Sequence, residues 1–346
     1  MSRRSALVVA PGRGTYNKDE LGYLQRLHGD KHDLLAAFDH QRREEQQDSI
    51  LELDAAKRFS VARFTRGDNA SGLIYACAYG DYLSIDGEAF DVAAVTGNSM
   101  GWYIALACAG AVSGEAGFRI VNTMGTLMHE ALIGGQLLYP FVDDNWREIP
   151  GKRAELMALT ESISELYLSI DLGGMLVFGG SQDALTAAEE RLVPVGGRFP
   201  MRLSNHAAFH TPLQAPVSQL GLRKLESGLF RQPRRPLIDG RGHIWYPGVS
   251  DLEAMHDYTF RHQVVRSYDL TAAITNGVRE FAPDVIIILG PGSTLGGAVA
   301  QALIQTEWRG LRSKQHFAER QVTDPLLLSM GIDDQRNRVV NKGARR

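Results

Sequence analysis

The stretch FDVAAVTGNSMGWYIALACAGA occupies residues 90–111. Residues 90–95 form a mostly apolar run typical of a buried strand, and residues 103–111 have the small, apolar composition of a helix packed closely on a sheet. Between them lies Gly97-Asn98-Ser99-Met100-Gly101, a G-x-S-x-G motif. A strand, a sharp turn and a helix in this order expose a serine as a nucleophile, and the helix N-terminus favours negative charge beside it. The motif therefore predicts Ser99 as a nucleophile.

Further apolar runs at residues 6–10 and 285–289 have the composition of buried parallel strands, and Pro-Gly or Gly-Pro turns follow both. Short apolar strands alternate with helical stretches along most of the chain. This alternation predicts an α/β fold with a mostly parallel sheet and flanking helices, similar in plan to that of hydrolases.

Residues 135–204 have a different pattern, with a strand, a helix, two strands, a helix and a strand. This β-α-β-β-α-β order is typical of a ferredoxin-like unit. We expect it to be a small subdomain inserted into a discontinuous large subdomain that comprises residues 1–134 and 205–330. Residues 331–346 are polar and basic, and we expect them to form a frayed tail.

The composition narrows the class of protein. The 346 residues are 44% hydrophobic, which is ample for a large core, and the net charge of −3 gives no indication of a nucleic-acid partner. Cys77 and Cys108 lie in apolar, small-residue runs, where buried free thiols in a reducing compartment are expected. No run reaches the roughly 18 apolar residues of a membrane span. We therefore expect a cytoplasmic globular protein with no membrane or nucleic-acid partner.

A serine hydroxyl needs a base to become a nucleophile. The segment NHAAFHTP at residues 205–212 contains His206 and His210. Both are candidates, and their spacing from Ser99 does not distinguish between them.

The chain resembles the malonyl-CoA:acyl carrier protein transacylases and the acyltransferase domains of fatty acid and polyketide synthases. Four blocks in family order carry this resemblance, which spans roughly residues 5–305. They are residues 10–15 (APGRGT, similar to F-P-G-Q-G-S), 97–103 (GNSMGWY, similar to G-H-S-L-G-E-Y), 208–213 (AFHTPL, similar to A-F-H-S-P-L) and 290–296 (GPGSTLG, similar to G-P-G-x-x-L-x-G).

The resemblance implies that His210 is the base and that the reaction is ping-pong, with an acyl-Ser99 ester as its intermediate. It implies an oxyanion hole formed by the backbone N–H groups of Met100 and Arg13. The family orients its histidine through a backbone carbonyl, and by position that carbonyl belongs to Arg266.

Several residues depart from the family pattern. Malonyl-specific members hold the malonyl carboxylate with an arginine on the helix after the serine, and Met124 stands at that position. Arg119 matches a different family arginine, on another face of the helix. A carboxylate facing a methionine is costly, which argues against malonyl unless another cation enters the pocket. Arg13 is one candidate, because the family usually has glutamine there.

Two residues next to the serine also differ, since Asn98 replaces the usual histidine and Trp102 the usual glutamate or glutamine. Against this, Phe209 resembles the residue before the histidine in malonyl-type domains. We expect the acyl pocket to be lined by Asn98, Trp102, Met124 and Phe209.

The resemblance implies an acyl-CoA:acyl carrier protein S-acyltransferase. Its substrates are a coenzyme A thioester and the phosphopantetheine thiol of a transient acyl carrier protein partner, and no metal or tightly bound cofactor is implied. The acyl group is malonyl by family default, or an uncharged group such as acetyl because of Met124. Arg191, Arg198 and Arg202 cluster near the small subdomain and are candidates for binding an acidic carrier protein.

Two other functions remain open. A thioesterase that clears acyl groups from CoA or from a carrier protein would use the same serine and histidine, with water as the acceptor. A non-enzymatic scaffold would need neither residue. The product formed from acyl-CoA and a carrier protein distinguishes these functions.

Overall fold

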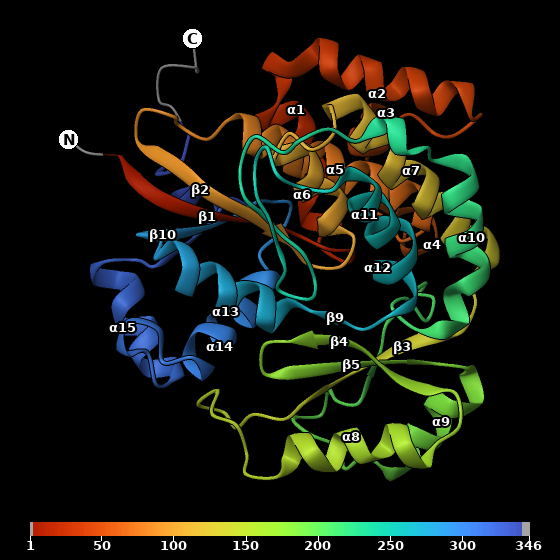
Figure 1. Ribbon diagram of the computed structural model, residues 1–346, viewed down its shortest axis with the longest axis vertical. Coiled ribbons are helices and arrows are strands. Elements are labelled where there is room, and N and C mark those ends of the chain that lie inside the picture. The colour runs from red at the N-terminus through yellow and green to blue at the C-terminus, as the bar shows by residue number, and fades with distance from the viewer. Residues whose placement is uncertain (1–2, 341–346) are drawn as a thin grey trace.

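The structure is a computed structural model that describes residues 3–340. Two parts lie one above the other in Figure 1, a larger α/β part and a smaller part that contains β3, β4 and β5. The larger part is built on a six-stranded sheet in the order β11-β10-β1-β2-β7-β8. Its pairs are parallel except for that between β7 and β8. The strands are β1 (Arg4–Ala10), β2 (Phe90–Gly97), β7 (Leu237–Ile238), β8 (Ile244–Trp245), β10 (Val285–Ile288) and β11 (Leu327–Ser329).

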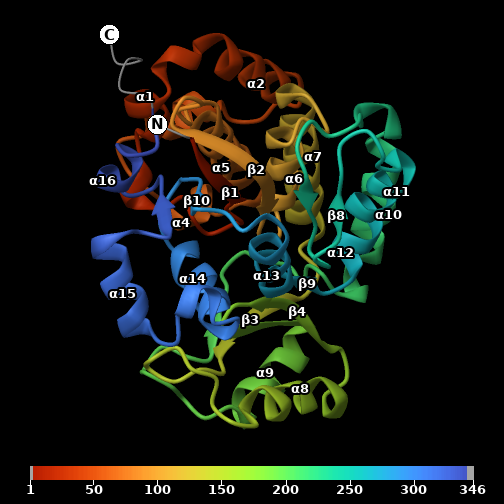
Figure 2. The same ribbon diagram turned by 60° about the vertical axis from the view of Figure 1, so that its left-hand side comes forward.

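The central strands of this sheet are buried, as expected for parallel strands covered on both faces. Helix α6 packs against β1 and β2, α5 and α7 pack around α6, and α13 also contacts β1 and β2 (Figure 2). The α/β class with a mostly parallel sheet is therefore confirmed. Across residues 3–340, no helix combines the length and the apolar character that crossing a membrane requires.

The helices have the following bounds: α1 (Tyr23–Leu27), α2 (His32–Glu44), α3 (Ile50–Asp54), α4 (Val61–Phe64), α5 (Gly67–Leu83), α6 (Gly101–Cys108), α7 (Gly114–Ala131), α8 (Lys152–Ser162), α9 (Gln182–Arg191), α10 (Ala215–Lys224), α11 (Leu252–Asp257), α12 (Gln263–Val265), α13 (Leu270–Phe281), α14 (Leu295–Gln305), α15 (Lys314–Thr323) and α16 (Asp333–Arg336).

The smaller part has a five-stranded sheet in the order β6-β3-β5-β4-β9. Its strands are β3 (Gly135–Pro140), β4 (Leu166–Leu172), β5 (Met175–Gly180), β6 (Met201–Arg202) and β9 (Tyr268–Asp269). Along the chain the order is β3-α8-β4-β5-α9-β6, which confirms the ferredoxin-like unit. Helices α8 and α9 cover the outer side of this sheet, so its other side faces the larger part (Figure 1). Strand β9 comes from a later segment and pairs with β4 in parallel.

The C-terminal segment differs from its prediction. We expect a frayed tail from residue 331, but residues 331–340 are ordered against the larger part. Arg336 on α16 is 3% exposed and forms an ion pair with the fully buried Asp81 of α5, and Val339 is buried. The polarity of the segment hides this contact, because the partner carboxylate lies 255 residues away in the chain. Residues 341–346 of the predicted tail lie outside the described residues.

Candidate active site

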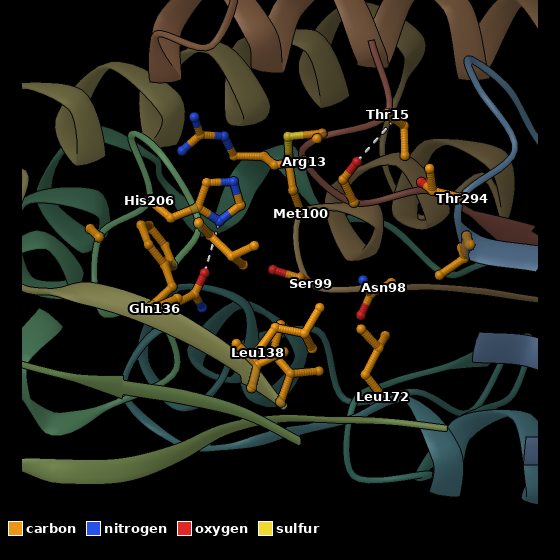
Figure 3. A pocket seen from close by; sticks show the side chains of 18 of the residues that line it. Arg13, Thr15, Asn98, Ser99, Met100, Gln136, Leu138, Leu172, His206 and Thr294 are labelled. Atoms are coloured by element: carbon orange, nitrogen blue, oxygen red, sulfur yellow. Dashed lines mark hydrogen bonds between the residues drawn. The ribbon is translucent and has the colours of Figure 1, made fainter. Parts of the chain in front are cut away.

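A cavity of about 490 Å³ lies between the two parts, and Ser99 lines it. Figure 3 shows Ser99 and Asn98 on the side of the larger part, with Leu138 and Leu172 of the small sheet below them. Most lining side chains are apolar. Those of the small sheet and its flanking loop include Leu138, Ile170, Leu172, Met175, Val177, Phe199 and Met201. The cavity therefore encloses the hydroxyl of Ser99 in largely apolar surroundings.

The turn at Ser99 is tight and strained. Ser99 has φ +56°, in the left-handed region that costs an L-residue about 1–2 kcal/mol. A Cβ atom on Gly97 would lie 2.2 Å from the carbonyl oxygen of Gly101, and one on Gly101 would lie 2.4 Å from that of Ala10. Neither position has room for a side chain. The two glycines of the motif therefore allow β2, the turn and α6 to pack closely enough to present the hydroxyl.

His210 forms a hydrogen bond with Ser99. The Ser99 Oγ–His210 Nε2 distance is 2.7 Å, and His210 Nδ1 lies 2.5 Å from the backbone carbonyl oxygen of Gln263. A carbonyl only accepts hydrogen bonds, so Nδ1 carries the proton and Nε2 is free to accept the hydroxyl proton of Ser99. The arrangement is that of a nucleophile, a base and a group that orients the base.

The protonation of His210 suits this geometry. The side chain is almost fully buried, and burial lowers the pKa of His210 to about 4, because a charged imidazolium loses its hydration. The hydrogen bond to the Gln263 carbonyl opposes this shift only in part. At neutral pH the imidazole is therefore uncharged and able to accept a proton.

The residue that orients His210 differs from the prediction. The carbonyl beside His210 Nδ1 belongs to Gln263 and not to Arg266. The resemblance in this region is weak, so nothing in the sequence fixes its register, and the chain makes a π-helical turn at Tyr258–His262 just before Gln263. Arg266 ends the following turn of helix, where its backbone N–H donates to His262.

Gln263 makes further contacts that the sequence does not predict. Its side-chain Nε2 donates to the carbonyl oxygen of Ser99 at 3.0 Å, and its Oε1 accepts from the hydroxyl of Tyr103 at 3.1 Å. Gln263 thus contacts both the turn that carries Ser99 and the ring of His210. A glutamine after a weakly matching segment gives no sequence signal for this position.

His206, the other candidate base, lines the cavity but contacts a different side chain. Its Nδ1 is 2.8 Å from Oε1 of Gln136, as Figure 3 shows. Burial and the neighbouring positive charge of Arg13 lower the pKa of His206 to about 3, so it is neutral at physiological pH. The hydrogen bond to Ser99 is made by His210.

Two backbone N–H groups near Ser99 have no acceptor. Within residues 3–340, neither the N–H of Met100 nor that of Arg13 donates a hydrogen bond. Both residues line the cavity. Unpaired N–H groups beside a nucleophile can stabilise an oxyanion, and the N-terminus of α6 adds a favourable dipole.

Three of the four residues expected in the acyl pocket line the cavity, and one does not. Asn98, Met124 and Phe209 line the cavity. Trp102 does not, because its side chain lies fully buried on the other side of α6, where Nε1 donates to Thr259. The expectation for Trp102 is therefore wrong, since the residue three positions after Ser99 faces the core. On α7, Arg119 is exposed and does not line the cavity, whereas Met124 is 1% exposed.

No protein-family model matches the chain, and no curated protein matches it. Several solved structures do match the chain. The malonyl-CoA:ACP transacylase of a Synechocystis species is 18% identical, with 97% of this chain and 100% of that chain covered and a TM-score of 0.73. The malonyl-CoA:acyl carrier protein transacylase of Xanthomonas oryzae pv. oryzae is 17% identical, with 99% of this chain and 100% of that chain covered and a TM-score of 0.75. A malonyl-transacylase in complex with a type II polyketide synthase acyl-carrier protein is 16% identical, with 97% and 99% covered and a TM-score of 0.72. This chain therefore has the fold of the malonyl-CoA:acyl carrier protein transacylases.

Proposed function

We propose that this protein is an acyl-CoA:acyl carrier protein S-acyltransferase that works through an acyl-Ser99 ester. The observation that carries the proposal is the hydrogen-bonded series Ser99–His210–Gln263, whose Ser99 and Gln263 line a largely apolar cavity. The fold shared with malonyl-CoA:ACP transacylases supports the same reaction class.

In the first half-reaction, His210 Nε2 accepts the proton of Ser99 Oγ as this oxygen attacks the thioester carbonyl carbon of acyl-CoA. The negative charge on the carbonyl oxygen is stabilised by the N–H groups of Met100 and Arg13. The carbon–sulfur bond then breaks, and the sulfur of coenzyme A receives the proton from His210. The products are acyl-Ser99 and free coenzyme A.

In the second half-reaction, the phosphopantetheine thiol of the carrier protein enters the same cavity. His210 accepts the thiol proton as the sulfur attacks the ester carbonyl carbon. The bond to Ser99 Oγ breaks, and this oxygen receives the proton from His210. The products are the acyl-carrier thioester and the free serine. In both half-reactions His210 transfers the proton.

The carrier partner is supported by the structure solved with an acyl-carrier protein bound to a transacylase of this fold. Arg198 lines the cavity and is exposed, so it is suitably placed to contact an acidic partner at the entrance. Arg202 is less available, because it forms an ion pair with Glu189. We therefore propose Arg198 as the first contact with the carrier protein.

Two residues of the cavity, Met124 and Arg13, bear on which acyl group Ser99 carries. Met124 removes the cation that malonyl-specific enzymes of this fold carry on the helix after the serine, which favours an uncharged group such as acetyl. Arg13 brings another cation to the same cavity, which favours the malonyl default.

The test is to incubate purified protein with acyl-CoA and a holo-carrier protein, and to measure the products by mass spectrometry. We expect acyl-carrier protein from the wild type, and no acyl adduct and no product from Ser99→Ala. Free acid as the only product would establish a thioesterase instead. Unchanged function of Ser99→Ala in cells would support a scaffold.

A further inference from the structure

The backbone of His210 is held in a strained conformation from two sides. Its φ is +60°, in the left-handed region that residues other than glycine seldom adopt. On one side, the N–H of His210 donates to the carbonyl oxygen of Val264 on α12 at 2.9 Å. On the other side, the carbonyl oxygen of Phe209 accepts from the hydroxyl of Ser169 on β4 at 2.7 Å. Because a strained conformation persists only where its surroundings fix it, these two bonds define the peptide plane from which the base projects.

A series of hydrogen bonds through the small sheet orients the hydroxyl of Ser169. Nε2 of Gln136 donates to Ser169 Oγ at 2.7 Å, and Oε1 of Gln136 lies 2.8 Å from Nδ1 of His206 (Figure 3). The Phe209 carbonyl can only accept, so it receives the single hydroxyl proton of Ser169. Ser169 Oγ must then accept from the amide of Gln136, and the carbonyl oxygen of Gln136 accepts from the N–H of His206. Every donor in the series has one acceptor, which gives the hydroxyl of Ser169 one orientation.

A β-bulge in β4 aims Ser169 at this carbonyl. The pairing of β4 with β5 shifts between Leu168 and Ile170, so Ser169 is the additional residue of the bulge. Bulges redirect side chains and are frequent beside active sites. On β5, Gly179 leaves room for the chain, because a Cβ atom there would lie 2.7 Å from Cγ2 of Thr211, the residue after the base. Two irregular features of the small sheet thus bring it against the segment that carries the base.

We propose that Ser169 is a positioning residue for His210, and that the small sheet thereby orients the base for both half-reactions. Ser169 is fully buried and is not among the described residues that line the cavity, so it does not contact the acyl group or the arriving thiol. Its influence reaches the reaction through the carbonyl that it binds. This inference rests on the proposed function, because it takes His210 as the base that acts on acyl-CoA and on the carrier thiol.

The experiment measures the reactivity of Ser99 in Ser169→Ala with two reagents. The first is malonyl-CoA or acetyl-CoA, whichever loads the wild type, followed by the holo-carrier protein. The second is diisopropyl fluorophosphate, whose phosphorus the Ser99 oxygen attacks as the phosphorus–fluorine bond breaks and His210 accepts the hydroxyl proton. Both reactions need the base, but only the first needs a binding site for coenzyme A.

We expect the rate with each reagent to fall about 10- to 100-fold, because a misplacement of about 1 Å can cost about 100-fold. The KM for acyl-CoA should stay unchanged. Acylation of Ser99 and transfer to the carrier protein should fall by the same factor, since His210 acts in each. A residue that only bound one substrate would affect one half-reaction.

Three further variants separate positioning from a general loss of stability. Ser169→Thr keeps the hydroxyl and should recover most of the rate, whereas Ser169→Cys fills the same space with a weaker donor and should remain slow. Tyr139→Phe is the matched control. The hydroxyl of Tyr139, on β3 of the same sheet, donates to the carbonyl oxygen of Val193 at 2.6 Å, and its ring packs in the cluster on the outer side of the sheet. Its loss removes a hydrogen bond of the same kind and should leave all rates unchanged.

Wild-type rates in folded Ser169→Ala and Ser169→Cys would overturn the proposal, and so would an equal loss of rate in Tyr139→Phe. A slower acylation by acyl-CoA with unchanged rates of fluorophosphate labelling and carrier transfer would also overturn it, because Ser169 would then affect substrate binding alone. If the wild type reacts with the fluorophosphate but forms no adduct with either CoA thioester, the proposed function is contradicted, and the labelling rates of the variants still decide the role of Ser169.

Discussion

The neutral state of His210 couples folding stability to pH. A free histidine has a pKa near 6.5, whereas burial lowers that of His210 to about 4. Between these values the unfolded chain binds a proton at this residue and the folded chain does not, so protonation favours unfolding. The contribution of His210 to stability is therefore complete above pH 6.5 and is lost as the pH falls toward 4. At about 1.4 kcal/mol per pH unit, the loss amounts to about 3 kcal/mol.

The measurement is the free energy of unfolding in urea at pH steps from 7 to 4.5, for the wild type and His210→Gln. Glutamine does not titrate, so we expect the wild type to lose stability more steeply with falling pH, by about 1.4 kcal/mol per unit below pH 6. His32→Gln, a substitution at an exposed histidine, is the matched control. In the same range, kcat/KM for acylation should remain constant until the pH approaches 4. An identical slope in His210→Gln, or an activity midpoint near 6.5, would refute this reasoning.

Two further predictions concern the turn at Ser99, and a third concerns the C-terminal contact. Because Ser99 has φ +56°, the free energy of unfolding in urea should be about 1 kcal/mol higher for Ser99→Gly than for Ser99→Ala, and both variants should be inactive. Equal free energies of unfolding would show that the turn is unstrained. Gly101→Ala should cost about 2 kcal/mol and abolish acylation, because its Cβ would lie 2.4 Å from a backbone oxygen, whereas Gly87→Ala, which has open space around its Cβ, should behave like the wild type in both assays. Arg336→Ala leaves Asp81 buried without its cation and should lower the free energy of unfolding by about 3–5 kcal/mol; a loss under about 1 kcal/mol in urea denaturation would contradict the importance of the C-terminal contact.

Much of the fold could be predicted because its signals are local. The apolar runs at residues 6–10 and 285–289 correspond to β1 and β10, since strands covered on both faces need continuous apolar sequence. The ferredoxin-like order of residues 135–204 could be predicted because each of its strands and helices also has a local sequence pattern. The contact of Arg336 with Asp81 was not predictable, because a polar segment looks the same whether it faces solvent or a distant buried carboxylate.

The candidate site likewise has one part that the local sequence predicts and another part that it does not. Ser99 and its glycines form one local turn, so the motif contains the geometry. The interaction of His210 with Gln263 depends on a π-helical turn that has no sequence signature, and the prediction therefore fell on the wrong carbonyl. Trp102 was misplaced because position relative to Ser99 does not show which face of α6 points to the cavity.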